Sequence, residues 1–113
     1  YRKAAEIRER TQGESHPDLI IALTGLGRAL VEGDRSAEAI GPLRRAVALL
    51  ENRTIDPLRR AQPRFALARA LMRTGGHRQE ALELAETALA DFEEGGDAYP
   101  EDIDIVRTWL ARH

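Results

Sequence analysis

The chain of 113 residues has no cysteine, few aromatic residues and no long apolar run. The absence of cysteine excludes disulfides, thiolate metal ligands and a cysteine nucleophile. Aromatic residues make up 4% of the chain and hydrophobic residues 42%, with alanine and leucine dominating the apolar set. This composition favours closely packed helices over a β-sandwich, and the length suits one domain. The sequence therefore predicts a single all-α domain over residues 1–113.

An excess of one charge sign is also missing, because 17 basic residues stand against 19 acidic ones. This balance predicts no attraction to nucleic acid or to anionic lipid, and favours a protein partner. No apolar run approaches the roughly 20 residues of a membrane span, and no signal peptide opens the chain. We therefore expect a cytoplasmic protein. Because no Met begins the sequence, we also expect a fragment of a longer chain.

Apolar residues recur at helical spacing along most of the chain. Between residues 19 and 30, leucines and Gly27 fall on one face of a helix. A second stripe follows after a short connection, which forces the two helices to lie antiparallel, with Ser36 or Asp34 as the cap. Pro63 predicts a kink or a late start in the fourth helix. The predicted helices cover residues 1–11, 17–32, 36–52, 57–74, 78–94 and 101–112.

The two-helix unit occurs twice. Residues 67–89 repeat residues 26–47 at an offset of 41, which becomes 42 after one extra residue in the turn between the helices. Small residues recur where the helices would cross. In the second unit either Ala68 takes the place of Gly27, or Arg69 interrupts the pattern. A repeated helix pair with small crossing residues is typical of a solenoid, in which each unit buries its neighbour's apolar face.

The residues at the repeated positions resemble those at the characteristic positions of the tetratricopeptide repeat. These residues are Leu26, Gly27, Leu30, Ala39, Leu43 and Ala46. The linker is similar to repeats of the kinesin light chain type, on Ile7-Arg8-Glu9, Gly13, His16-Pro17-Asp18 and Gly41-Pro42-Leu43. The resemblance implies a short right-handed superhelix of tandem antiparallel helix pairs. The second helix of a truncated repeat and its linker would cover residues 1–16. Two repeats would follow at 17–56 and 57–97, and a C-terminal capping helix at 98–113.

The resemblance also implies a non-catalytic module that binds a protein or peptide on its concave face. In this family the first helix of each repeat lines that face, which implies the helices at 17–32, 57–74 and 101–112. Arg28 and Arg69 occupy equivalent repeat positions, and paired guanidinium groups suit a carboxylate or phosphate. An acidic partner is therefore predicted. The expected groove residues are Thr24, Arg28, Val31, Gln62, Arg69 and Arg73.

The larger context is a further expectation. Such repeats resemble those in the C-terminal regions of bacterial multidomain regulatory proteins, including serine/threonine kinases. The ratio of sixteen arginines to one lysine is compatible with a bacterial source. An alternative is a structural segment, in which an open edge around Tyr1 and Ala5 stacks on further repeats or on a second copy. Self-association would follow from that edge.

Charges along the chain admit two interpretations. Nine arginines lie between residues 44 and 78, and ten acidic residues without a basic one lie between 80 and 104. Arginines of the helix at 57–74 would either pair with acids of the last two helices, or face a partner in the groove. Trp109 is expected to seal the apolar face of the helix at 78–94, as a cap does at the end of a solenoid.

No enzyme, metal or cofactor is predicted. His16, His77 and His113 lack a serine, a cysteine or paired carboxylates with which to act. His77 and Glu80 are spaced to share a metal ion, but a third ligand is missing. The glycine pairs at 75–76 and 95–96 are interpreted as helix ends and not as phosphate loops.

Overall fold

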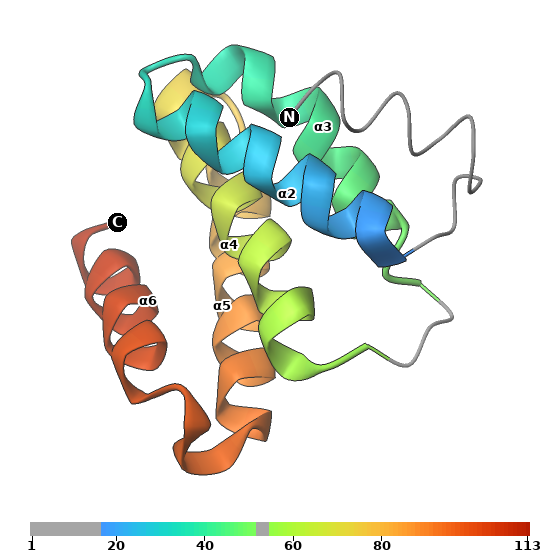
Figure 1. Ribbon diagram of the computed structural model, residues 1–113. Coiled ribbons are helices and arrows are strands. Elements are labelled where there is room, and N and C mark those ends of the chain that lie inside the picture. Colours follow the sequence, from blue (N-terminus) through green and yellow to red (C-terminus); the bar gives the residue numbers. More distant parts are fainter. Residues whose placement is uncertain (1–16, 52–54) are drawn as a thin grey trace.

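The computed structural model describes residues 17–51 and 55–113, which form five α-helices and one short 3-10 helix (Figure 1). The helices α2 and α3 make one antiparallel pair, α4 and α5 make a second, and α6 follows α5. The predicted all-α fold of sequential helix pairs is confirmed, and the helix predicted at 1–11 lies outside the described residues. The elements are α2 (Pro17–Glu32), α3 (Ser36–Ala48), α4 (Pro57–Thr74), α5 (Arg78–Glu94), η1 (Gly96–Ala98) and α6 (Pro100–Arg112).

Three helices, α2, α4 and α5, have the bounds that the sequence predicts, whereas α3 ends four residues early. After Ala48 the backbone tightens, because the N–H of Leu50 donates to the carbonyl of Val47 at 3.1 Å. Such bonds to the third residue back belong to a turn and not to an α-helix, and they bring Leu50 into the core. Within the two described ranges, no helix is both long and apolar enough to cross a membrane.

The sequence predicts the cap of α4 but not that of α3. Asp56 caps α4 by accepting a hydrogen bond from the N–H of Arg59 at 3.0 Å, so the late start predicted from Pro63 is wrong. The predicted cap of α3 is also wrong, because Arg35 holds the N-cap position without a side-chain cap bond. Asp34 instead takes a positive φ of 62° in the turn. Ser36 is already inside the helix and buried.

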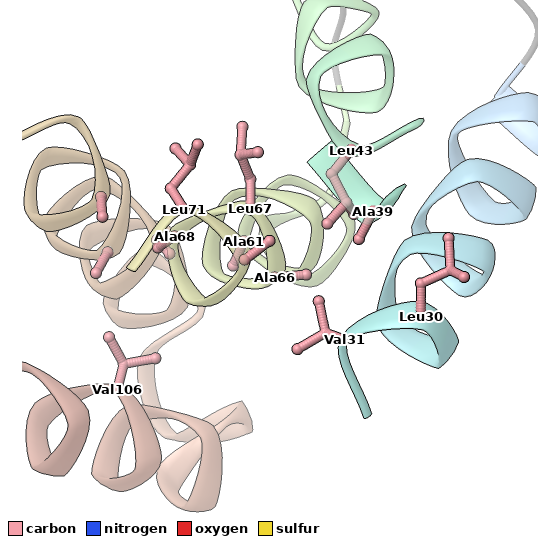
Figure 2. Packing of buried hydrophobic residues seen from close by; sticks show 14 of the residues in the cluster. Leu30, Val31, Ala39, Leu43, Ala61, Ala66, Leu67, Ala68, Leu71 and Val106 are labelled. Atoms are coloured by element: carbon pink, nitrogen blue, oxygen red, sulfur yellow. The ribbon is translucent and has the colours of Figure 1, made fainter. Parts of the chain in front are cut away.

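The core forms where small side chains let the helices approach. A Cβ atom added to Gly27 of α2 would lie 2.3 Å from Cγ of Leu43 in α3. In the second pair Ala68 and Ala85 are fully buried, whereas Arg69 is partly exposed. Ala68 therefore takes the place of Gly27, as one of the two predicted alternatives required. Figure 2 shows the buried side chains of α2, α3, α4 and α6 gathered around this core.

The last helix, α6, packs on α5, which precedes it in the sequence, and it also contacts α4 through an aromatic pair. Val106 is its one buried residue. The ring of Trp109 meets the ring of Phe65 edge on, with centroids 5.7 Å apart. Trp109 therefore packs on a side chain of α4, and its role in sealing α5 stays a prediction. α6 forms a wall beside α4 as well as a cover for α5.

Candidate functional site

Three hollows lie along the face that α2, α4 and α6 form. The first measures about 300 Å³ between α2 and α4, the second about 130 Å³ at the centre, and the third about 460 Å³ between α4 and α6. Arg28 and Gln62 border both the first and the second hollow. Phe65, Arg69 and Ile105 border both the second and the third. Because neighbouring hollows share these residues, they form one surface, which we call the α2–α4–α6 groove.

Three of the predicted site residues, Arg28, Gln62 and Arg69, meet in this groove. Arg28 is exposed and has neither a hydrogen bond nor an ion pair within the described part of the chain. The guanidinium of Arg69 lies 6.0 Å from the ring centroid of Phe65, a cation–π distance. The two arginines come from equivalent turns of α2 and α4, which is why they face the same surface. The groove therefore presents Arg28 and Arg69, and neither forms an ion pair with an acid of α5 or α6 among the described residues.

Two predicted residues of α2 have structural roles. Val31 is 1% exposed and points from α2 toward α4 (Figure 2), so the prediction that it lines the groove is wrong. Its side chain is buried because α2 contacts α4 as well as α3. Thr24 borders the first hollow but is itself buried. Its hydroxyl donates to the carbonyl of Ile20 at 2.7 Å, which satisfies this donor within the helix.

Arg73 is held at the end of α4, away from the three hollows. It donates to Oδ1 of Asp34 at 2.8 Å and to the carbonyl of Val31 at 3.3 Å. These bonds tie the second helix pair to the turn of the first. The structure therefore does not bring Arg73 together with Arg28 and Arg69, and it gives Arg73 a role in joining the two pairs.

Apolar residues of the groove were missed by the sequence analysis. Ile21 of α2 is 45% exposed and borders the first hollow, and Ile105 of α6 is 56% exposed and borders the other two. Both lie outside the apolar stripe of their helix, and that offset was the available signal. Large apolar side chains exposed together on one surface mark binding sites more often than isolated ones do.

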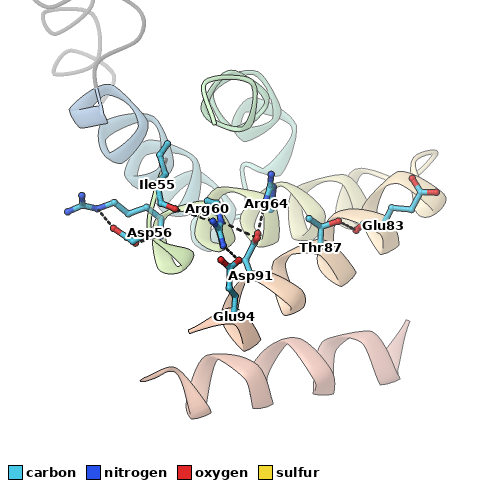
Figure 3. A network of polar contacts seen from close by, with 9 residues as sticks. Ile55, Asp56, Arg60, Arg64, Glu83, Thr87, Asp91 and Glu94 are labelled. Atoms are coloured by element: carbon cyan, nitrogen blue, oxygen red, sulfur yellow. Dashed lines mark hydrogen bonds and ion pairs between the residues drawn. The ribbon is translucent and has the colours of Figure 1, made fainter. Parts of the chain in front are cut away.

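The internal pairing of arginines with acids is confirmed for the first half of α4 (Figure 3). Arg64 Nη1 lies 2.5 Å from Oδ2 of Asp91, and Arg60 Nε lies 3.3 Å from Oδ1 of the same carboxylate. Arg60 also pairs with Glu94. The arginines of α4 therefore have different roles. Arg60 and Arg64 hold α5, whereas Arg69 faces the groove. Arg59 pairs with Asp56 at the start of its own helix.

An exposed ion pair joins α3 to α5. Arg44 donates to Glu80 at 2.5 Å, and this hydrogen bond is the main cause that lowers the pKa of Glu80 from its ordinary value. His77, the other half of the predicted metal pair, lies 3.8 Å from Glu80. In the ranges that the structure covers, no three histidine, aspartate or glutamate side chains are grouped as metal ligands would be.

The pair between Arg44 and Glu80 predicts a small pH effect. A carboxyl whose folded pKa is lowered contributes stability above its unfolded pKa, and this is lost as the pH falls through the folded pKa. We expect Glu80→Gln to lower the free energy of unfolding at pH 7 by less than about 1 kcal/mol, because both side chains are exposed. Urea unfolding at pH 7 and pH 3 measures this, and the difference between the two chains should be smaller at pH 3. A difference of the same size at both pH values would show that charge is not its cause.

Comparison with known proteins gives one family. The family described as tetratricopeptide repeat matches residues 1–52, which include α2 and α3. No curated protein and no solved structure matched the chain. The pair of α4 and α5 lies beyond the matched residues and repeats the arrangement of the first pair. Predictions that involve Tyr1, Ala5 and His16 fall outside the described residues.

Proposed function

We propose that this chain is a non-catalytic protein-interaction module that binds a segment of a partner protein along the α2–α4–α6 groove. The match of residues 1–52 supports this, since tetratricopeptide repeats generally act as protein-interaction modules. One observation carries the proposal. Arg28 has no acidic partner among the described residues, and it lies in the same groove as the exposed Ile21 and the partly exposed Arg69.

The chemistry of the groove indicates the kind of partner. Arginine and aromatic side chains are enriched at protein interfaces, where they provide most of the binding free energy. A carboxylate can accept two hydrogen bonds from one guanidinium, so acidic residues in the partner would satisfy Arg28 and Arg69. Exposed isoleucines on the same surface would bury apolar side chains of the partner. We infer an acidic segment that also carries apolar residues.

The wider context is part of this proposal. The linker residues Ile7-Arg8-Glu9 and His16-Pro17-Asp18 support a repeat of the kinesin light chain type. We place such a repeat in a longer bacterial regulatory protein of the cytoplasm, where this module would recruit the partner. The domain composition and the cellular location of the full-length protein in its source organism test this placement.

Charge reversal in the groove tests the proposed function. Affinity capture with the full-length protein should retain a partner, and the double variant Arg28→Glu, Arg69→Glu should retain at least about tenfold less of it. The loss is expected because the partner's carboxylates would then meet like charge. Arg78→Glu is the matched control, since Arg78 is exposed at the start of α5 and borders none of the three hollows.

Both variants should keep the circular dichroism of the unmodified chain, because the altered side chains lie outside the core. If the double variant captures the partner as well as the control does, the partner binds elsewhere on the molecule. The proposed groove would then be abandoned.

A further inference from the structure

We propose that the third hollow, between α4 and α6, receives one bulky apolar side chain of the partner, while Arg69 binds an acidic side chain next to it in the same segment. This inference rests on the proposed function and deepens it. It assigns to α6 a part in recognition, in addition to its part in covering α5. The residues that carry it are Phe65, Arg69, Ile105 and Trp109.

The apolar wall of this hollow comes from two helices. Phe65 of α4 and Trp109 of α6 meet at an interplanar angle of 86°, so one ring edge faces the other ring's plane. Ile105 lies one turn before Trp109 on α6 and is more than half exposed. The hollow of about 460 Å³ lies within the size range of ligand sites, and an apolar side chain placed there would cover Ile105 and the two rings.

Arg69 lies beside this apolar wall. Its guanidinium stands over the ring of Phe65 and borders the second hollow as well as the third. Stacking on a ring limits the positions of a long side chain, so less freedom is lost when it binds an anion. A carboxylate bound there would sit directly beside the apolar anchor. The segment should therefore carry its acidic residue close to its bulky apolar residue.

The acidic group is a side chain within the segment and not the end of a chain. The third hollow continues into the second through Phe65, Arg69 and Ile105, and the second is bordered by Arg28. A bound segment can therefore run on past Arg69 toward α2. From α6 the hollows are bordered by two acids, Asp102 and Asp104, and by one cation, Arg112. From α2 and α4 they are bordered by Arg28, Arg59 and Arg69 and by no acid, so the net basic charge lies on that side. The carboxylate should face α4.

A randomised twelve-residue peptide display library, selected on the unmodified chain, provides the probes for a test. The selected peptides are then synthesised and titrated while the fluorescence of Trp109, the single tryptophan, is recorded. We expect the peptides to share a bulky apolar residue near an acidic one and to shift the emission of Trp109. Ile105→Ser and Arg69→Glu should each weaken binding about tenfold or more, whereas Arg78→Glu should not.

A charge exchange separates recognition by Arg69 from general disruption. Replacing the acidic residue of the peptide with lysine should weaken binding to the unmodified chain and restore binding to Arg69→Glu. Peptides that depend on Arg28 but leave the emission of Trp109 unchanged would overturn this inference, and the proposed function would stand. Selection of no peptide sensitive to Arg28 or Arg69 would overturn both.

Discussion

Replacing Gly27 with valine is expected to lower the free energy of unfolding by about 3 kcal/mol. The Cβ of the new residue would lie 2.3 Å from both Cγ and Cδ2 of Leu43, and Leu43 is fully buried. The methyl groups of valine would add further overlap. The two helices of the first pair would separate, and the core between them would lose contacts. Thermal or urea unfolding followed by circular dichroism measures this change.

Gly41 provides the control, because it also lies inside a helix and a Cβ built on it meets no other helix within 4 Å. Gly41→Ala should change the free energy of unfolding by less than about 1 kcal/mol, because the lower backbone freedom of alanine is offset by contact of its Cβ with the ring of Pro42. Combining Gly27→Val with Leu43→Ala should cost less than the sum of the single changes, because the second makes room for the first. The close approach of α2 and α3 would be contradicted if the two losses in free energy of unfolding were additive, or if Gly27→Val left that free energy unchanged.

Replacing Asp91 with alanine should be the second severe change, with a loss of about 3 kcal/mol. The carboxylate is 10% exposed and holds two guanidinium groups of α4, those of Arg60 and Arg64. Its removal leaves two partly buried cations next to each other without an anion between them. Repulsion and the lost hydrogen bond of Arg64 then act on the contact between α4 and α5. Urea unfolding at neutral pH measures the loss.

Glu94→Ala is the control for Asp91, because Glu94 pairs with Arg60 from a position that is 62% exposed. Water replaces that partner readily, so the expected loss is below about 1 kcal/mol. Equal losses for the two variants would show that Asp91 contributes no more than a surface ion pair. The network in Figure 3 would then not hold the second helix pair together.

The helices were predictable where local signals and packing signals agree. Asp56 followed by Pro57 starts α4, and the glycine at its end takes a positive φ of 80°. The recurrence of small residues predicted that Gly27 would face a neighbouring helix. The start of α3 was not predictable in this way, because Asp34 takes the turn conformation and pairs with Arg73 of a helix far along the chain. That contact exists only in the folded molecule.

The candidate site was predictable in part. Equivalent positions in the two repeats identified Arg28 and Arg69, since equivalent helices turn the same face outward. Val31 was misplaced because α2 touches two helices, and this widens its buried face beyond the stripe seen in the sequence. Ile105 was missed because its exposure depends on how α6 lies against α4 and α5. That orientation is fixed by Val106 and by the contact of Trp109 with Phe65.

The account depends most on one claim, which is that the α2–α4–α6 groove binds a segment of a partner. Chemical-shift mapping of the isotopically labelled chain, titrated with a selected peptide, tests this claim directly. We predict that the largest changes fall on Arg28, Gln62, Phe65, Arg69 and Ile105. Changes concentrated on the outer faces of α3 and α5, with these five residues unaffected, would contradict it.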